Sequence, residues 1–192
     1  EGDVIGSDSG GGFKPYDVFG IQLLSDSIGG EDVFEGGKDD DLIYGQFGND
    51  TFVFAGGGLG NDRLVEASNS NSRPNDLHDR LDFSRFINKI EVDLEENERQ
   101  SVNGKKFEGD INLTAKLFSG TAFEDVTGSD FSDEIEGNVR DNTLVGLSGK
   151  DELDGEGGND LLIGGDDADE LEGDDGRDIV IGTFTLLDED PV

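Results

Sequence analysis

The sequence predicts an all-β solenoid, in which short strands and tight turns wind into stacked coils. Residues 128–181 divide without insertion into six units of nine residues, each opened by a glycine: GSDFSDEIE, GNVRDNTLV, GLSGKDELD, GEGGNDLLI, GGDDADELE and GDDGRDIVI. An aliphatic residue fills the eighth place of every unit, which suits a three-residue strand that buries its middle side chain. A period this short is typical of a solenoid whose neighbouring units share one thin core.

The first six residues of each unit are rich in glycine, which adopts positive φ in tight turns at little cost. Two units then form one flattened coil, so that units 18 residues apart stack on the same edge. The sixth place of every unit holds an acid or an amide: Asp133, Asn142, Asp151, Asp160, Asp169 and Asp178. Stacking brings these carboxylates opposite one another, and such like charges require a cation between them. Carboxylate and turn carbonyl oxygens are hard donors, so we expect that cation to be Ca²⁺.

A shorter block with the same register begins at Ser27 and reads SIGGEDVFE, GGKDDDLIY and GQFGNDTFV, followed by a three-residue insertion at 54–56 and GGLGNDRLV. Its sixth-place acids are Asp32, Asp41, Asp50 and Asp62. Residues 66–127 break the period, but they retain strand-like triplets at 80–82, 91–93 and 125–127. Helix propensity at 84–89 and 113–118 allows a short helix in either irregular stretch.

We expect one β-solenoid domain over residues 1–192. Its parts are a first repeat block, a middle of irregular coils and loops, a second repeat block and a C-terminal cap, at 27–65, 66–127, 128–182 and 183–192. An inserted subdomain in the middle is the alternative, but about 60 residues of this polarity offer little material for a separate core.

The chain carries 47 acids against 14 bases, for a formal net charge of -33, which argues against nucleic acid as a partner. No segment has the roughly 18 apolar residues of a membrane span, and the lack of cysteine excludes disulfides and thiolate zinc sites. A disordered tail or a halophile's surface would also be acidic, but these acids keep register with glycines and aliphatics. Because the chain begins at Glu1 without a methionine or signal peptide, we expect a monomeric module of a larger chain.

These units resemble the GGxGxDxUx nonapeptide of the repeats-in-toxin (RTX) family, and the resemblance covers both repeat blocks. It implies a calcium-bound parallel β-roll in a bacterial protein that is secreted by a type I machine and located outside the cell or on its surface. The family includes toxins, proteases, lipases, epimerases, surface-layer proteins and large adhesins. The repeat therefore predicts a scaffold and a metal, but not an activity.

The resemblance also implies a ligand set for each pair of stacked turns. One turn gives the carbonyls of its second and fourth residues and its sixth-place carboxylate, and the turn stacked on it gives the carbonyls of its first and third residues and its own carboxylate. The implied sets are Leu147, Gly149 and Asp151 with Gly164, Asp166 and Asp169; Glu156, Gly158 and Asp160 with Gly173, Asp175 and Asp178; Ile28, Gly30 and Asp32 with Gly45, Phe47 and Asp50; and Gly37, Asp39 and Asp41 with Gly57, Leu59 and Asp62.

Two units of the second block depart from the family pattern. Phe131 and Arg140 replace the fourth-place glycine, and Asn142 replaces the acid. The resemblance extends the metal sites to Asp133 and Asn142, but we expect the sites there to be weaker or missing, with Arg140 acting in part as a local counter-ion. Roughly six calcium ions are expected in total.

Catalysis is not expected of this chain, because His78 is its only histidine and neither HExxH nor GxSxG occurs. Two functional classes stay open: a module of a large adhesin that binds a cell-surface peptide or glycan through non-repeat loops, and a calcium-driven folding and export scaffold of a secreted epimerase, protease or lipase. The irregular middle favours the adhesin. Its candidate ligand-binding residues are Arg73, His78, Arg80, Arg99 and Lys105. Alternatively, these residues only soften the negative field of the domain.

Overall fold

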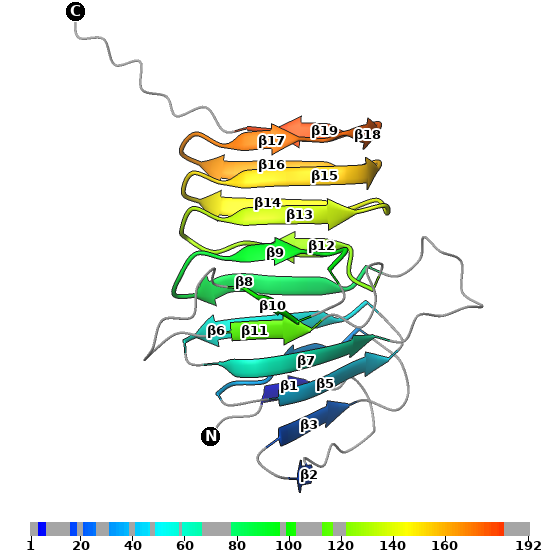
Figure 1. The fold of residues 1–192 in the computed structure, drawn as a ribbon, viewed down its shortest axis with the longest axis vertical. Coiled ribbons are helices and arrows are strands. Elements are labelled where there is room, and N and C mark those ends of the chain that lie inside the picture. The colour runs from blue at the N-terminus through cyan, green and yellow to red at the C-terminus, as the bar shows by residue number, and fades with distance from the viewer. Residues whose placement is uncertain are drawn as a thin grey trace, which may run out of the picture.

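The computed structural model describes most of the chain, with gaps. The described residues are 4–6, 16–18, 21–25, 31–38, 41–46, 49–57, 59–66, 78–96, 99–102, 113–116 and 122–182. Every regular element in these ranges is a β-strand, and most neighbouring strands pair in parallel. The strands stack as rungs along one long axis (Figure 1). The predicted all-β fold, a parallel β-roll, is therefore confirmed.

One face of the roll is a single eight-stranded sheet, which runs along the whole stack. Its order is β1 (Val4–Gly6), β4 (Val33–Glu35), β6 (Thr51–Gly56), β8 (Arg80–Phe86), β12 (Asp125–Thr127), β14 (Thr143–Ser148), β16 (Leu161–Asp166) and β19 (Ile179–Ile181). All neighbours pair in parallel except β1, which is antiparallel to β4. The eighth-place residues lie in register, from Phe34 through Phe52 and Leu81 to Leu144 and Leu162.

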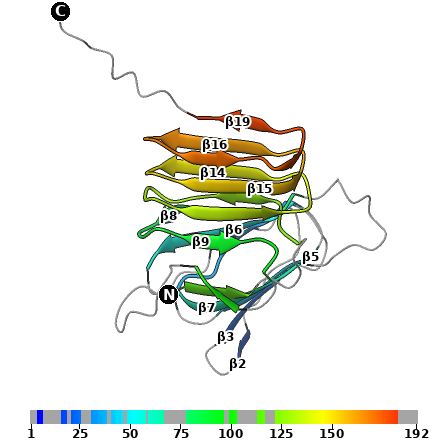
Figure 2. The same cartoon turned by 45° about the horizontal axis from the view of Figure 1, so that its top comes forward.

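The opposite face is divided between two smaller sheets, which Figures 1 and 2 show one above the other. The five-stranded sheet has the order β17 (Glu170–Glu172), β15 (Glu152–Gly158), β13 (Glu134–Asn138) and β9 (Glu91–Asp93), and β18 (Asp175–Gly176) pairs with β15. The six-stranded sheet has the order β10 (Arg99–Ser101), β11 (Leu113–Lys116), β7 (Gly60–Glu66), β5 (Asp41–Gln46), β3 (Ile21–Ser25) and β2 (Tyr16–Val18). This face is therefore interrupted between β7 and β9.

The irregular middle contributes strands to both faces. β8 and β12 pair in register between β6 and β14, so the eight-stranded sheet passes through this stretch without a break. The allowance for a short helix was wrong, because residues 84–86 end β8 and residues 113–116 form β11. Hydrogen bonding to neighbouring strands outweighs the weak local preference for helix. The division of the chain into domains stays a prediction, and the predicted cap at 183–192 lies outside the described residues.

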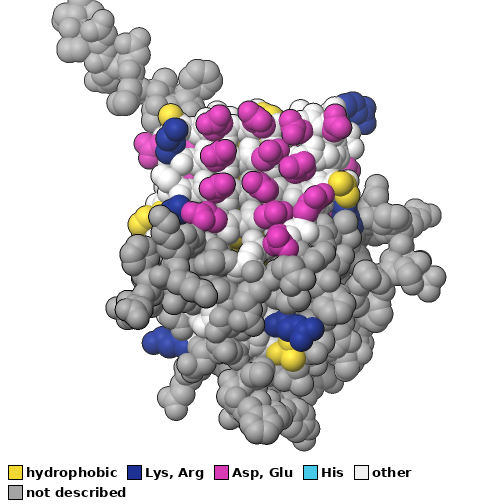
Figure 3. All heavy atoms as spheres, in the orientation of Figure 1, with side chains coloured by type: hydrophobic (Ala, Val, Ile, Leu, Met, Phe, Trp, Pro, Cys, Tyr) yellow, Lys and Arg dark blue, Asp and Glu magenta, His cyan; other side chains and the backbone are white. Residues whose placement is uncertain are grey.

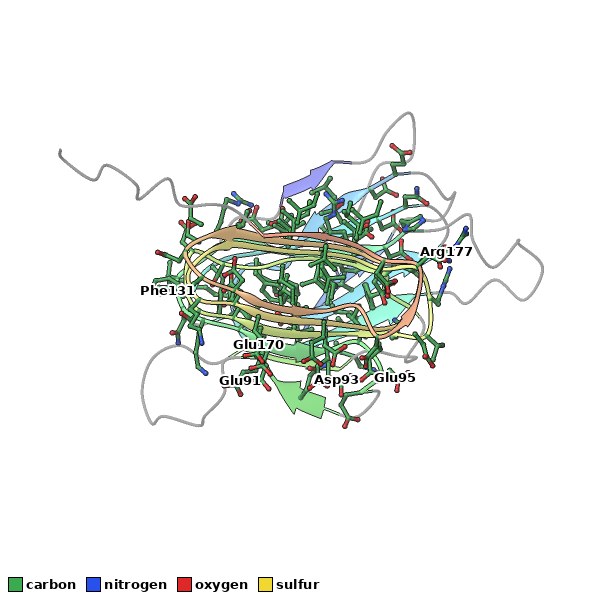
Figure 4. All side chains as sticks on the ribbon, turned by 90° about the horizontal axis from the view of Figure 1, so that it is seen from above. Glu91, Asp93, Glu95, Phe131, Glu170 and Arg177 are labelled. Atoms are coloured by element: carbon green, nitrogen blue, oxygen red, sulfur yellow. The ribbon has the colours of Figure 1, made fainter. Side chains whose placement is uncertain are left out.

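The core is a thin layer between the two faces, and Figure 4 shows the flattened outline of the coil from above. Four rungs of the second block each contribute one fully buried aliphatic side chain, Ile135, Leu144, Leu153 or Leu162, whereas Leu171 is partly buried and Val180 at the end of the stack is exposed. The core of the lower coils is aromatic: Phe34 and Phe52 have ring centroids 5.3 Å apart, and Phe54 stacks on Phe83 at 4.6 Å. Phe131 and Arg177 lie at opposite edges of the coil, which is where the turns are (Figure 4).

Candidate metal centre

The sixth-place side chains form two columns, one at each edge of the roll, at or near the start of the strands. We call these columns the first and the second ladder. The first ladder precedes the strands of the eight-stranded sheet and consists of Asp32, Asp50, Asp79, Glu124, Asn142, Asp160 and Asp178. The second ladder lies at the start of strands of the opposite face and consists of Asp41, Asp62, Asp133, Asp151 and Asp169, of which Asp41 and Asp62 lie within β5 and β7. Most of these residues are buried.

One carboxylate oxygen of each upper rung is fixed by the backbone of the rung below. The N–H of Asp151 donates to Asp169 Oδ1 at 3.1 Å, and the N–H of Asp160 donates to Asp178 Oδ1 at 3.0 Å. The same bond recurs in the first block, from Asp32 to Asp50 at 2.9 Å and from Asp41 to Asp62 at 3.0 Å. The structure thus places Asp41 and Asp62 together across the three-residue insertion. Charge-assisted bonds of this kind hold each carboxylate in one orientation.

The other carboxylate oxygen has no such partner in three acids of the second block. The Oδ2 atoms of Asp151, Asp160 and Asp169 are buried, and none has a hydrogen-bond partner among the described residues. An unpaired buried carboxylate oxygen is costly, so these positions call for a cation.

Oxygens from two rungs converge at these atoms. A Cβ on Gly146 would lie 2.2 Å from Asp151 Oδ2 and 2.5 Å from the carbonyl oxygen of Gly164. Gly164 is the first residue of the upper turn, whose carbonyl the family resemblance assigns as a ligand. A Cβ on Gly155 would likewise lie 2.6 Å from Asp160 Oδ2. Only glycine leaves the space in which a carboxylate and a carbonyl can approach the same point.

The backbone of these turns is held in an uncommon conformation. The second-place residues Leu147 and Glu156 have φ of 83° and 64°, and the fourth-place Gly149 and Gly158 have φ of 125° and 137°. Positive φ is costly for a residue such as leucine, and strain of this kind persists where a binding site requires it. These are the residues whose carbonyls the family resemblance assigns to the metal.

The donor set fits calcium. Among the described residues, no three acidic, histidine or cysteine side chains gather as a metal cluster. Each pair of stacked turns offers two carboxylates, and main-chain carbonyls would have to complete the coordination. Ca²⁺ accepts about six to eight oxygens in flexible geometry, which suits such a mixed set. Asp151 with Asp169, and Asp160 with Asp178, would hold one ion each, with carbonyls from Leu147, Gly149, Gly164 and Asp166 or from Glu156, Gly158, Gly173 and Asp175. These ligand assignments stay predictions.

The first block offers the same carboxylates, although part of its ligand set lies outside the described residues. Asp32, Asp41, Asp50 and Asp62 are all buried. Gly37 has φ of 88°, as expected for a turn, while Gly45 and Gly57 lie at the ends of neighbouring rungs. Ile28, Gly30, Asp39 and Phe47 lie outside the described residues. The predicted sites of this block therefore rest on the carboxylate pairs.

In the two units that depart from the repeat, hydrogen bonds within the turn occupy the oxygens of the sixth-place side chain. Both oxygens of Asp133 accept hydrogen bonds from Ser129, at 2.6 Å from its N–H and 2.8 Å from its hydroxyl. Asn142 Oδ1 accepts a bond from the N–H of Asn138 at 2.9 Å. Oxygens that are paired in this way are not directed at a cation. The expectation that sites at Asp133 and Asn142 are weaker or missing stays a prediction.

Two members of the first ladder were not predicted from the sequence. The N–H of Asp50 donates to Asp79 Oδ1 at 2.8 Å, and the N–H of Asp79 donates to Glu124 Oε2 at 3.0 Å. Both acids stand two residues before a buried aliphatic, Leu81 or Val126, as the sixth-place acids of the repeat do. That spacing was the available signal, and the loss of the ninefold period hid it.

The predicted ligand-binding residues are only partly described. His78 and Arg80 lie together at the start of β8, with side chains 43% and 46% exposed. Both face Asp125, at 3.5 Å from His78 Nδ1 and 3.4 Å from Arg80 Nη2. The side chain of Arg99 in β10 is not described, and Arg73 and Lys105 lie outside the described residues.

Acid should favour the folded state of the calcium-free protein. Burial, reinforced by neighbouring carboxylates, raises the pKa of Asp151 and Asp160 from 3.8 to about 6. Because this folded-state pKa lies above the unfolded one, the stabilisation is complete below about pH 4 and is lost as the pH rises through about 6. We expect the β signal in chelator to increase as the pH falls from about 7 to 4.

Circular dichroism in chelator measures this gain, and an Asp151→Asn, Asp160→Asn double variant should show less of it. In calcium the trend should reverse, because protons compete with the ion for the same oxygens. A calcium-free chain whose β signal falls on acidification would contradict the expected burial of these carboxylates.

Comparison with known proteins agrees with this geometry. The model of the RTX calcium-binding nonapeptide repeat matches residues 27–64, 127–162 and 154–184, which together cover half of the chain. No curated protein matches the sequence. The described residues contain no helix that is long and apolar enough to cross a membrane. Repeats of this family are typical of secreted proteins, which suggests an extracellular location. The chain belongs to the family of RTX calcium-binding nonapeptide-repeat proteins, and it is a calcium-binding β-roll module.

Proposed function

We propose that this chain is a non-catalytic module of a secreted or surface-anchored bacterial adhesin, in which the calcium-bound repeats hold non-repeat segments that bind a cell-surface peptide or glycan. The observation that carries the proposal is the interruption of one face of the roll between β7 and β9. Uninterrupted repeats would serve calcium-driven folding and export equally well, so that role gives no reason for the interruption.

The interruption is built from regular structure. β10 and β11 pair antiparallel, and β11 pairs in parallel with β7, so these two strands complete the six-stranded sheet at the interruption. Val102, just after β10, accepts a hydrogen bond from the N–H of Glu91 in β9 at 2.6 Å. The eight-stranded sheet continues behind them through β8 and β12. The middle of the chain is therefore displayed on a continuous β scaffold, and irregular segments on rigid scaffolds are the usual location of binding residues.

Positive side chains are scarce on this chain, and His78 and Arg80 place nitrogen donors at the start of β8 in the eight-stranded sheet. Both side chains are partly exposed, although both face Asp125. Figure 3 shows acidic side chains covering the upper part of the front face, with Lys and Arg at its margins and below. An acidic peptide or a carboxylate-bearing sugar is the ligand class that such donors would recognise.

A glycan and peptide array, probed with the folded module in calcium and again in chelator, tests this function. We expect calcium-dependent binding to at least one ligand class. Replacing residues 68–75 by a short Gly-Ser link should abolish that binding and leave calcium-dependent folding intact.

The same replacement at residues 103–106, which include the candidate residue Lys105, tests the second non-repeat segment. If both folded variants keep full binding, the site lies elsewhere on the module. If no array ligand binds the calcium-loaded wild type, the adhesin proposal fails, and a folding and export scaffold becomes the better explanation.

A further inference from the structure

The first ladder contains a junction between Asp79, Glu124 and Asn142 that differs from the calcium sites above it. Glu124 is almost completely buried, with 1% of its surface exposed. Its Oε2 accepts the hydrogen bond from the N–H of Asp79 at 3.0 Å. The N–H groups of Glu124 and Asp125 donate to the carbonyl oxygen of Asp79, each at 3.1 Å, and Asn142 Nδ2 donates to the carbonyl oxygen of Glu124 at 2.9 Å. The three rungs are thus joined by hydrogen bonds.

The second oxygen of Glu124 has a cation from the chain itself. Nη1 of Arg140 forms an ion pair with Glu124 Oε1. The corresponding oxygen two rungs above, Oδ2 of Asp160, is buried without a hydrogen-bond partner among the described residues. Arg140 also stands at the fourth place of its unit, where the units above have Gly149 and Gly158. The guanidinium of Arg140 therefore lies beside the Glu124 carboxylate, where a calcium ion would otherwise be needed.

The side chain of Asn138 is hydrogen-bonded within and below the turn that carries Arg140. Asn138 accepts a bond from the N–H of Arg140 at 3.0 Å and donates through Nδ2 to the carbonyl oxygen of Phe123 at 2.8 Å. The non-glycine residues with positive φ in the described chain are Leu147, Glu156, Asp167 and Asp174, so this turn lacks the strained backbone of the calcium sites. Ser129 closes the turn at the other edge of the same coil around Asp133.

Electrostatics explain why this junction needs a positive charge. Burial raises the pKa of Glu124 to about 8 and that of Asp79 to about 6, although Arg140 opposes both shifts. A carboxylate buried this deeply is stable only when a cation or a proton accompanies it.

We propose that Arg140 replaces a calcium ion at this junction, so that the rungs of β8, β12 and β14 stay joined without metal. The upper part of the second block, from β15 to β19, lacks such a residue at its buried carboxylates and depends on calcium. The chain then contains a calcium-independent centre next to a calcium-dependent stack.

Hydrogen–deuterium exchange of the whole chain in chelator tests the proposal on the wild type. We expect the amides of β8 and β12, and those of Glu124, Asp125 and Thr143, to stay protected, while β16, β17 and β19 exchange rapidly. If β8 and β12 lose protection as completely as β16, the junction depends on calcium and the proposal is wrong.

Arg140→Gln removes the charge and keeps a polar side chain. In chelator it should lower the protection of β8 and β12 by about a hundredfold or more, because it leaves a buried carboxylate without its cation. Arg85→Gln is the matched control, since Arg85 lies in β8 and pairs with Glu35 at 2.9 Å through an exposed side chain. Equal protection in the two variants would overturn the role of Arg140.

A double variant, Arg140→Gly with Asn142→Asp, restores the repeat at this turn. In calcium it should bind about one ion more than the wild type, as measured by equilibrium dialysis with elemental analysis. A folded double variant with unchanged ion content would show that Arg140 does not occupy the place of an ion. If the double variant does not fold, the exchange pattern of the wild type still decides the question.

Discussion

Removing calcium should abolish most of the β structure of the two repeat blocks, and adding about 1 mM calcium should restore it. The formal charge of -33 is concentrated on stacked rungs. On the outer face of the five-stranded sheet, Glu134, Glu152 and Glu170 lie in register, and Glu136, Asp154 and Glu172 form a parallel row. Like charges directly opposite one another destabilise a sheet, and the core of one side chain per rung offers little to offset them.

Far-UV circular dichroism in chelator, followed by a calcium titration, measures this loss and recovery. Magnesium is the control, because it is smaller, prefers strict octahedral geometry and should not restore the signal at the same concentration. The rows of acids in Figure 3 and the outward-pointing Glu91, Asp93 and Glu170 in Figure 4 show where the repulsion acts. A calcium-free chain with the β content of the calcium-bound one would refute the coupling of metal to fold.

Replacing Asp160 by alanine should lower both calcium affinity and stability. Asp160 Oδ1 accepts the bond from the N–H of Asn142 at 2.7 Å, and its own N–H donates to Asp178 Oδ1 at 3.0 Å. The change removes both Oδ1, which accepts the bond from Asn142, and the buried Oδ2. The predicted calcium ion thereby loses one of its two carboxylate ligands. We expect a loss of about 3 kcal/mol in calcium, or roughly 10 °C in Tm, and a higher calcium midpoint for folding.

Glu172→Ala is the matched control for this change. Glu172 is exposed in β17, and its neighbour in register is Asp154, another acid. Removing one of two like charges should leave the Tm unchanged or raise it slightly. Equal losses in the two variants would mean that the ladder is assigned to the wrong residues.

The regular part of this fold could be predicted because each nine-residue unit of the sequence corresponds to one turn and one strand of the coil. The ninefold spacing fixes which side chains are buried, and so Leu144, Leu153 and Leu162 were placed in the core from their positions alone. The pairing of Asp41 with Asp62 was also predicted, and it survives the insertion because residues 54–56 extend strand β6, with a register shift between Val53 and Ala55.

The middle of the chain was harder to predict, because the residues that pair there are not separated by a constant number of residues. Asp50 and Asp79 are 29 residues apart, and Asp79 and Glu124 are 45 residues apart. Their ladder bonds are the same as those of the repeats, but no fixed spacing points to them. The pairing of β11 with β7 has no periodic signal either, since it depends on which sheet edge is open once the rungs have stacked.

Ser129 and Asn138 form hydrogen bonds across their own turns, and these bonds depend on side-chain conformation more than on the repeat pattern of the sequence. The sequence showed the missing glycines at Phe131 and Arg140 and the missing acid at Asn142, and it predicted weaker sites. It did not predict that the second-place side chain would take over the hydrogen bonds, as Ser129 does for Asp133.

The interruption of one face has a mechanical consequence. Hydrogen bonds join all rungs along the eight-stranded sheet, whereas the opposite face has no strand pairing between β7 and β9. A bending load should therefore stretch the two faces unequally. The continuous face resists extension through its backbone bonds at every rung. The other side can open by breaking only the few bonds between the segments of β9 and β10, such as the one from the N–H of Glu91 to the carbonyl oxygen of Val102 at 2.6 Å. The rod should consequently bend in one preferred direction, with the eight-stranded sheet on the inside of the curve.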